Sequence, residues 1–295
     1  MLDEMNKEHF LNREHSGEYA EVAFDTYVSN KGKEDVIDIV TNIHYYEAGE
    51  GEPLIMVHGV GQNSYTWRNN FYELAKDFHV YAIDLPGHGF SGKPEISYTV
   101  EEFALALEAF MNVNKIVSAS FCAFGEAAVY VLDFAIHNLD RTDKLVFISP
   151  VISETGGILK GRGLNCVFGS MAGKMKNPQV VRSVLEDCYF DRTLLGDEVV
   201  QEYWEGMNDK DFRIIARMCV TNFIDDNVIS SLHVLKAPVL VILGTDDKIT
   251  GGKNSNFMHL GFGRSNVIEV RNCGYLVHEE KYERTNDAIK TFLKG

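Results

Sequence analysis

Hydrophobic and polar residues follow two alternating patterns along this chain. Apolar runs of strand length recur at residues 21–28, 36–46, 53–59, 79–85, 115–120, 144–150, 237–244 and 266–270. Apolar residues at helical spacing fill segments such as 99–113 and 282–295, which lie between or after these runs. Strands that alternate with helices predict an α/β protein, with a mostly parallel sheet covered by helices on both faces.

The first two runs are arranged differently from the rest. They flank the polar, glycine-containing stretch SNKGKED at residues 29–35. Two strands separated by such a loop predict an antiparallel hairpin at the start of the fold.

One long segment breaks the alternation of strands and helices. Roughly 80 residues from 151 to 234 carry helix-like patterns and no strong strand, which is too long for a simple loop. We therefore expect a helical lid at 151–234, inserted into a core formed by 1–150 and 235–295. Ligands of open parallel sheets bind beyond the carboxyl ends of the strands, where such a lid would lie.

Charge and composition narrow the class of protein. The formal net charge of -15 argues against a nucleic-acid partner, because a basic face could form only if the few lysines and arginines were segregated on it. No apolar run reaches the length of a membrane span, and the polar N-terminal stretch does not resemble a signal peptide. The five cysteines form no C-x-x-C pair, as is typical of reduced thiols. We expect a cytoplasmic protein with no membrane or nucleic-acid partner.

Several motifs follow one another in an order that resembles the α/β-hydrolase superfamily. In chain order they read HGVGQNSYTWR, AIDLPGHGFSGKP, YTVEEFALALEAF, APVLVILGTDDKI and NCGYLVHEEKYERTNDAIKTFL. The chain is most similar to the lidded branch that includes C–C bond hydrolases, epoxide hydrolases, haloalkane dehalogenases and esterases. The resemblance begins near Ile43 and implies a catalytic triad, together with an oxyanion hole formed by the backbone N–H groups of Val60 and Ala123.

The nucleophile of that superfamily lies at a sharp turn between a strand and a helix. A gapless match of MNVNKIVSASFCAFG to the family's turn places Cys122 at the tip, with Ser120 and Phe124 as its flanking residues. The flanking positions are normally small, which Phe124 is not. A competing register places Ser120 at the tip, so the sequence leaves two candidates and favours Cys122.

The other two triad positions follow from the same resemblance. Asp247 matches the acid, in the pattern Gly-x-x-Asp after the strand at 237–244. Tyr275 occupies the position of the catalytic histidine, and His278 matches a second histidine that is not catalytic in the family. Since a phenol has a reference pKa of about 10, it cannot replace imidazole as a general base at neutral pH. The resemblance therefore implies a degenerate triad.

The ligand and the reaction remain open between three hypotheses. Trp67, Phe121 and Phe124 are candidates for lining a site that holds a small-molecule or peptide ligand under the lid. We expect no metal because the histidines lack ligand spacing, and we expect no cofactor. The first hypothesis is non-hydrolytic acid–base chemistry on a carbonyl-containing ligand, namely isomerisation, epimerisation or elimination. The second is a cysteine hydrolase of activated esters, thioesters or lactones. The third is a binding protein without catalysis.

Overall fold

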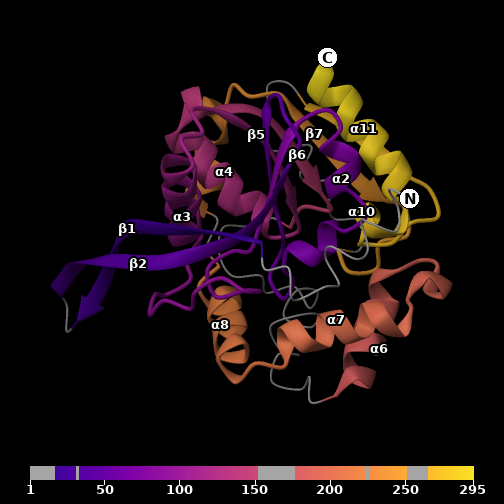
Figure 1. Cartoon of the computed structure of the whole chain (residues 1–295), viewed down its shortest axis with the longest axis horizontal. Helices are drawn as coiled ribbons and strands as arrows, with labels where there is room; N and C mark the ends of the chain where they lie inside the picture. Colours follow the sequence, from indigo (N-terminus) through magenta and orange to yellow (C-terminus); the bar gives the residue numbers. More distant parts are fainter. Residues whose placement is uncertain (1–16, 31–32, 152–176, 224–225, 251–264) are drawn as a thin grey trace.

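The computed structural model of the chain describes residues 17–30, 33–151, 177–223, 226–250 and 265–295 (Figure 1). Eight strands form one sheet in the order β1-β2-β4-β3-β5-β6-β7-β8. The pairs β1–β2 and β2–β4 are antiparallel, and every other neighbouring pair is parallel. The α/β class and the mostly parallel sheet predicted from the sequence are confirmed.

The strand bounds show how the sheet is divided between a long hairpin and a compact parallel part. The strands are β1 (Glu18–Asn30), β2 (Lys33–Ala48), β3 (Pro53–Val57), β4 (His79–Ile83), β5 (Ala119–Phe124), β6 (Thr142–Ile148), β7 (Val239–Gly244) and β8 (Ser265–Val270). The hairpin of β1 and β2 is confirmed, and it extends to the left in Figure 1 beyond the other strands. Along β1, the side chains of Ala20, Val22 and Phe24 are buried while those between them are exposed, as expected for a strand with one covered face.

Helices cover both faces of the parallel part (Figure 1). On one side lie α3 (Val100–Val113) and α4 (Ala127–His137), and on the other α2 (Phe71–Leu74), α10 (Val277–Glu280) and α11 (Tyr282–Lys294). The start of α3 is fixed by a capping box, in which the Thr99 side chain accepts from the Glu102 N–H and the Glu102 side chain accepts from the Thr99 N–H.

Between β6 and β7, the described residues form only helices. They are α6 (Pro178–Cys188), η4 (Arg192–Leu194), α7 (Asp197–Met207), α8 (Lys210–Thr221), α9 (Asp226–Ser231) and η5 (Leu232–Val234). In Figure 1, α6, α7 and α8 lie together below the sheet. The first part of the predicted lid, 152–176, lies outside the described residues, and the bounds 151–234 stay a prediction.

Strand β5 begins later than the sequence pattern indicated. The apolar run at 115–120 predicted a strand there, but Lys115 has a φ of +56° and Val117 is 82% exposed. Residues with a left-handed backbone end helices, and the Lys115 N–H and Ile116 N–H bond back to carbonyls of α3 and its last turn. The chain therefore finishes the helix cap before it enters the sheet at Ala119. The turn after β5 therefore lies later in the sequence than predicted.

The described part of the chain contains neither a membrane-spanning helix nor a candidate metal site. None of its helices has both the length and the apolar composition needed to cross a membrane. Nor does that part contain a group of three or more histidine, cysteine, aspartate or glutamate side chains arranged to hold a metal ion.

Candidate active site

The sharp turn between β5 and α4 is centred on Gly125. Strand β5 ends at Phe124, Gly125 has a φ of +60°, and α4 begins at Ala127. A left-handed residue between a strand and a helix is the strained geometry expected of a nucleophile elbow. The residues on either side of the central three, Ala123 and Ala127, are both small, as close strand–helix packing requires.

The prediction that Cys122 stands at the tip of this turn is therefore wrong. Cys122 lies inside β5, where it pairs with Met56 of β3 and Val146 of β6, and its side chain is fully buried. Burial raises the pKa of its thiol, which opposes formation of a thiolate nucleophile. The alternative, Ser120, also lies within the strand and pairs with Leu54.

Tyr275 meets the elbow directly. A Cβ atom added to Gly125 would lie only 2.7 Å from the Tyr275 Oη. The phenol thus occupies space that the side chain of a nucleophile would need. Tyr275 is held there by its backbone, because its N–H donates to the Cys188 carbonyl (2.8 Å) and its carbonyl accepts from Ser149 Oγ (2.7 Å). Burial raises the pKa of the phenol, so it stays protonated.

The residue after the turn, Glu126, carries the most unusual group of the site. Burial raises the pKa of its carboxyl, while the backbone N–H groups of Val60 and of Glu126 itself act to lower this pKa, so both N–H groups lie close to the carboxyl. The N–H after the nucleophile and an N–H from the loop after β3 are the two donors of an oxyanion hole in this architecture. The Glu126 carboxyl therefore lies near the two N–H groups that would receive a substrate oxygen in an oxyanion hole.

Of the two backbone N–H groups predicted to form the oxyanion hole, that of Val60 lies near this site and that of Ala123 does not. Val60 was predicted as a donor and lies beside the Glu126 carboxyl. Ala123 was predicted as the second donor, but it pairs with Val57 and Phe147 inside the sheet, so the donor after the turn belongs to Glu126. Gly59 lies against the same carboxyl, since a Cβ there would be 2.9 Å from Glu126 Oε2.

The electrostatics of Glu126 set it apart from an ordinary surface carboxylate. The residue is 2% exposed, and burial raises its pKa to about 7, although the two backbone N–H groups act in the opposite direction. Its Oε1 has no hydrogen-bond partner among the described residues. The Glu126 carboxyl is thus buried, and its Oε1 lacks a hydrogen-bond partner among the described residues. Because its pKa is about 7, it is about half protonated at neutral pH.

Tyr130 lies one helical turn after Glu126 on α4 and shares its environment. Its ring stacks on Phe103, with centroids 4.4 Å apart, and its hydroxyl is buried without a partner among the described residues. The charge of Glu126 contributes to the raised pKa of Tyr130. Two polar groups one helical turn apart that lack partners among the described residues indicate a place where a ligand or water completes the hydrogen bonding.

Asp247, the predicted acid, is engaged in its own turn. Its Oδ1 accepts from the N–H of Ile249 (2.8 Å) and of Thr250 (3.1 Å), and its Oδ2 accepts from Thr250 Oγ1 (2.5 Å). Burial raises its pKa against these bonds. The negative charge of Asp247 contributes to the raised pKa of the Tyr275 phenol, so the two residues lie close enough to interact electrostatically.

The three aromatic residues predicted to line the ligand site have different surroundings. Phe121 is fully buried against Phe134 of α4, and Trp67 is fully buried against His278, with ring centroids 5.1 Å and 4.6 Å apart. Phe124 packs on Tyr275 at 4.7 Å, so it alone of the three adjoins the elbow pair.

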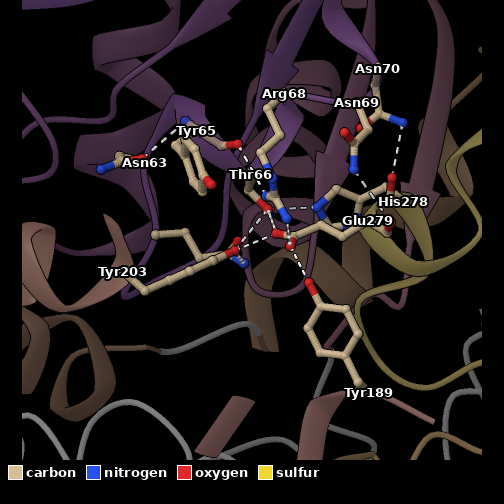
Figure 2. Close-up of polar contacts among 11 residues, drawn as sticks. Asn63, Tyr65, Thr66, Arg68, Asn69, Asn70, Tyr189, Tyr203, His278 and Glu279 are labelled. Carbon is tan, nitrogen blue, oxygen red and sulfur yellow. Dashed lines mark hydrogen bonds and ion pairs between the residues drawn. The ribbon is translucent and has the colours of Figure 1, made fainter. Parts of the chain in front are cut away.

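A buried ionic cluster lies next to the site and joins the core to the helices between β6 and β7. Figure 2 shows Thr66, Arg68, Tyr189 and Tyr203 around the carboxylate of Glu279. Arg68 Nη2, Tyr189 Oη and Thr66 Oγ1 donate to this carboxylate at 2.7, 2.5 and 2.7 Å, and Tyr203 Oη is a fourth donor. Burial opposes the charge, but Arg68 and these hydrogen bonds lower the pKa of Glu279 to about 2.

His278 belongs to this cluster and not to the elbow. Its Nε2 lies 2.7 Å from Thr66 Oγ1 and, because that hydroxyl donates to Glu279, the imidazole donates to Thr66. Its ring lies 4.6 Å from both Trp67 and Phe124, and burial lowers its pKa to about 4. This is the structural role expected of a second, non-catalytic histidine.

Sequence reasoning missed Gly125, Glu126 and Tyr130. One signal was present: the segment AFGEA at 123–127 has small residues on both sides of a three-residue centre, as an elbow requires. It is recognised only if glycine is accepted at the nucleophile position.

The sequence of this chain is similar to a known protein family. The family model for the alpha/beta hydrolase family matches residues 54–288. Over 272 residues the chain is 25% identical to 2-hydroxy-6-oxo-6-phenylhexa-2,4-dienoate hydrolase from Comamonas testosteroni, a match that covers 85% of this chain and 91% of that protein. It is 29% identical over 144 residues to a haloalkane dehalogenase from Agrobacterium fabrum, covering 49% of this chain and 46% of that protein, so the chain spans less than half of that relative.

Solved structures share the fold. A meta-cleavage product hydrolase from Pseudomonas fluorescens superimposes with a TM-score of 0.77 at 21% identity, covering 91% of this chain and 97% of that one. The matched span of the family model takes in β3 to α11, including the elbow at Gly125 and the Tyr275 loop. This chain belongs to the alpha/beta hydrolase family.

Proposed function

We propose that this protein performs non-hydrolytic acid–base chemistry on a small carbonyl-containing ligand, with Glu126 as the group that carries the proton. The reaction class is isomerisation, epimerisation or elimination. The observation that carries the proposal is the Glu126 carboxyl, buried beside the oxyanion donors with Oε1 unpaired among the described residues.

The absence of a side chain at Gly125 supports a route without a covalent intermediate. A nucleophilic mechanism needs an oxygen or sulfur at the tip of the elbow, and glycine supplies neither. The Tyr275 phenol fills that space. Cys122 does not rescue the cysteine-hydrolase hypothesis, because it lies within β5.

The protonation behaviour of Glu126 supports a catalytic role. A general base or acid works best when its pKa is near the operating pH, and burial brings this carboxyl to about 7. With Oε1 as the acceptor, the group removes a proton next to a carbonyl and returns it elsewhere on the ligand. The protonated phenols of Tyr275 and Tyr130 supply hydrogen-bond donors to the enolate oxygen that forms.

Proton exchange at carbon tests this without knowledge of the natural ligand. The protein is incubated in D₂O with a panel of ketones and aldehydes, and deuterium incorporation next to the carbonyl is followed by NMR. We expect exchange on at least one compound class, with a rate that rises through a pH of about 7 as Glu126 ionises. Glu126→Gln should lower it by about 10²-fold or more.

The matched variant Cys122→Ala separates the glutamate from the cysteine. It removes the thiol from the middle of β5 and should leave exchange unchanged. If Glu126→Gln retains full exchange, or if Cys122→Ala abolishes it while remaining folded, the assignment to Glu126 is wrong.

A second candidate is a binding protein without turnover. The contact between the Tyr275 phenol and the elbow favours it, since the pair closes the reactive centre of the fold with an unreactive group. Ligand binding that survives Glu126→Gln, with no exchange on any compound in the wild type, would favour this candidate over the first.

A further inference from the structure

The β1–β2 hairpin exposes a face that is both apolar and acidic. Alternate side chains of these strands point away from the core, and on that side Tyr27 lies opposite Val36. Asp25 lies opposite Asp38 on the same side. Tyr27, Val36 and Val40 are each between 57% and 62% exposed, and neighbouring exposed apolar side chains commonly mark a surface that binds a partner. We call this surface the hairpin face, and its residues used below are Glu21, Asp25, Tyr27, Val36, Asp38 and Val40.

The carboxylates of the hairpin face lack cationic partners. No ion pair joins Glu21, Asp25 or Asp38 to a lysine, arginine or histidine among the described residues. Asp38 raises the pKa of the Asp25 carboxyl, so these two opposed carboxyls lie close together. Like charges directly opposite each other destabilise a strand pair, and a cation from outside the hairpin would relieve this repulsion.

Helix α8 exposes a surface of the opposite charge. The buried residues of this helix share one side, and three cations together with Ile214, which is 61% exposed, recur at helical spacing on the other side. Across the described part of the chain, none of the three cations has an ion-pair partner, and Nε of Arg213 has no hydrogen-bond partner. The helix contains one carboxylate, that of Asp211. We call this surface the α8 face, and it consists of Lys210, Arg213, Ile214 and Arg217.

One loop connects the two faces. The Gly92 N–H donates to the Asn42 carbonyl of β2 at 2.8 Å. The next residue, Lys93, is ion-paired with Asp209, the N-cap of α8. In Figure 1 the hairpin projects to the left, and α8 is drawn nearer to it than α6 or α7. The hairpin face and the α8 face therefore belong to elements that the same loop holds.

We propose that this chain forms a two-fold symmetric dimer, in which the hairpin face of each copy packs on the α8 face of the other. A second copy fits because the chain itself supplies both faces, which are opposite in charge and both partly apolar. Two-fold symmetry makes each contact occur twice.

Physical chemistry sets what holds such a dimer together. Carboxylates of one copy attract the cations of the other, and the exposed apolar side chains of both faces become buried. The formal net charge of -15 opposes association at long range, so the attraction has to come from this local pairing of charges. The inference concerns assembly alone and does not depend on chemistry at Glu126.

Sedimentation equilibrium of the full chain tests the proposal, and the wild type should form a dimer with a Kd of about 10 µM or below. A hairpin variant carries Asp25→Lys and Asp38→Lys, which keeps two like charges opposed within the hairpin. An α8 variant carries Lys210→Glu and Arg217→Glu, both at exposed positions. Each variant alone should dimerise about tenfold or more weakly, because like charges then meet across the interface.

Mixing the two variants tests whether the two faces contact each other. In a mixed dimer the reversed hairpin face meets the reversed α8 face, and the unchanged hairpin face meets the unchanged α8 face. Every charge pair is then complementary again, so the mixture should dimerise about as tightly as the wild type.

Two control variants reverse the same number of charges elsewhere. Glu269→Lys with Glu283→Lys matches the hairpin variant, and Lys236→Glu with Arg284→Glu matches the α8 variant. These four positions are exposed and lie on or near β7, β8 and α11, whereas β1 forms the other edge of the sheet. Both controls should leave the Kd of the dimer unchanged.

Three results would overturn the proposal. The first is a wild type that stays monomeric at about 100 µM, which would assign the two faces to partners other than this chain. The second is dimerisation that the face variants do not weaken, or that the controls weaken equally. The third is a mixture that dimerises as weakly as either variant alone.

Circular dichroism checks that each variant folds, and the single changes Asp38→Lys and Arg217→Glu replace a double variant that does not. The wild-type measurement requires no variant at all. None of these results bears on proton exchange by Glu126, so the two proposals fail separately.

Discussion

Replacing Gly125 with alanine should lower the free energy of unfolding, because the new side chain would collide with Tyr275. The new Cβ would sit 2.7 Å from the Tyr275 Oη, a distance that real side chains do not tolerate, and 3.8 Å from the Cζ behind it, which is an ordinary contact. Removing the hydroxyl alone, as in Tyr275→Phe, should therefore relieve the clash while leaving the ring in position.

The magnitude follows from two separate costs. A non-glycine residue at a φ of +60° loses about 1–2 kcal/mol of stability. Overpacking against a buried side chain costs about 1–3 kcal/mol more, so we expect Gly125→Ala to lower the free energy of unfolding by about 2–5 kcal/mol. The double variant with Tyr275→Phe should keep only the backbone cost, which gives a coupling energy of about 1–3 kcal/mol between the two sites.

Urea unfolding followed by circular dichroism measures all four proteins of this double-mutant cycle. Gly196→Ala is the control, because Gly196 has a φ of −69° and no heavy atom within 4 Å of the added Cβ, so its effect should stay below about 1 kcal/mol. Additive effects of Gly125→Ala and Tyr275→Phe would refute the contact between the phenol and the elbow.

Three further outcomes follow from buried groups. Iodoacetamide should leave Cys122 unmodified in the native protein and modify it in urea, as measured by peptide mass spectrometry, because its thiol is fully buried with a raised pKa; rapid native labelling would contradict its place in β5. The folded-state pKa of Glu279 is lowered from 4.5 to about 2, so its charge contributes about 3 kcal/mol of stability above a pH of about 4.5, and this is lost as the pH falls toward 2. The stability advantage of the wild type over Glu279→Gln should shrink over that range, and a constant difference in urea unfolding would count against the cluster. The folded-state pKa of Glu126 is raised from 4.5 to about 7, so the folded state binds its proton more tightly and stability should fall as the pH rises from 5 to 8. Glu126→Gln should lack this slope, and an unchanged slope in unfolding experiments would show that another group titrates.

Much of the fold could be predicted because its signals are local. The hairpin, the alternation of strands and helices and the motif order each depend on short segments of sequence. The placement of Tyr275 opposite the elbow also followed from the sequence, because the stretch from Asn272 to the terminal helix matches the family without a gap.

The elbow could not be placed because its position depends on a turn that sequence pattern does not reveal. Lys115 takes a left-handed conformation that glycine usually supplies, so the apolar Ile116 and Val117 read as the start of a strand. The role of Glu126 depends on the Val60 N–H, which comes from a loop 66 positions earlier in the chain. No local sequence pattern predicts a carboxyl that lies near the backbone N–H groups at the start of its own helix.

The contact between Gly125 and Tyr275 also limits which neighbouring sequences are open to this protein. A serine at 125 would collide with the phenol, whereas a histidine at 275 would face a glycine and have no hydroxyl to activate. Even both changes together would leave the Glu126 carboxyl beside the oxyanion donors. Serine hydrolysis would therefore require at least three substitutions, of which the first two bring no hydrolytic benefit when made singly. Selection for hydrolysis alone would therefore not favour these substitutions one at a time.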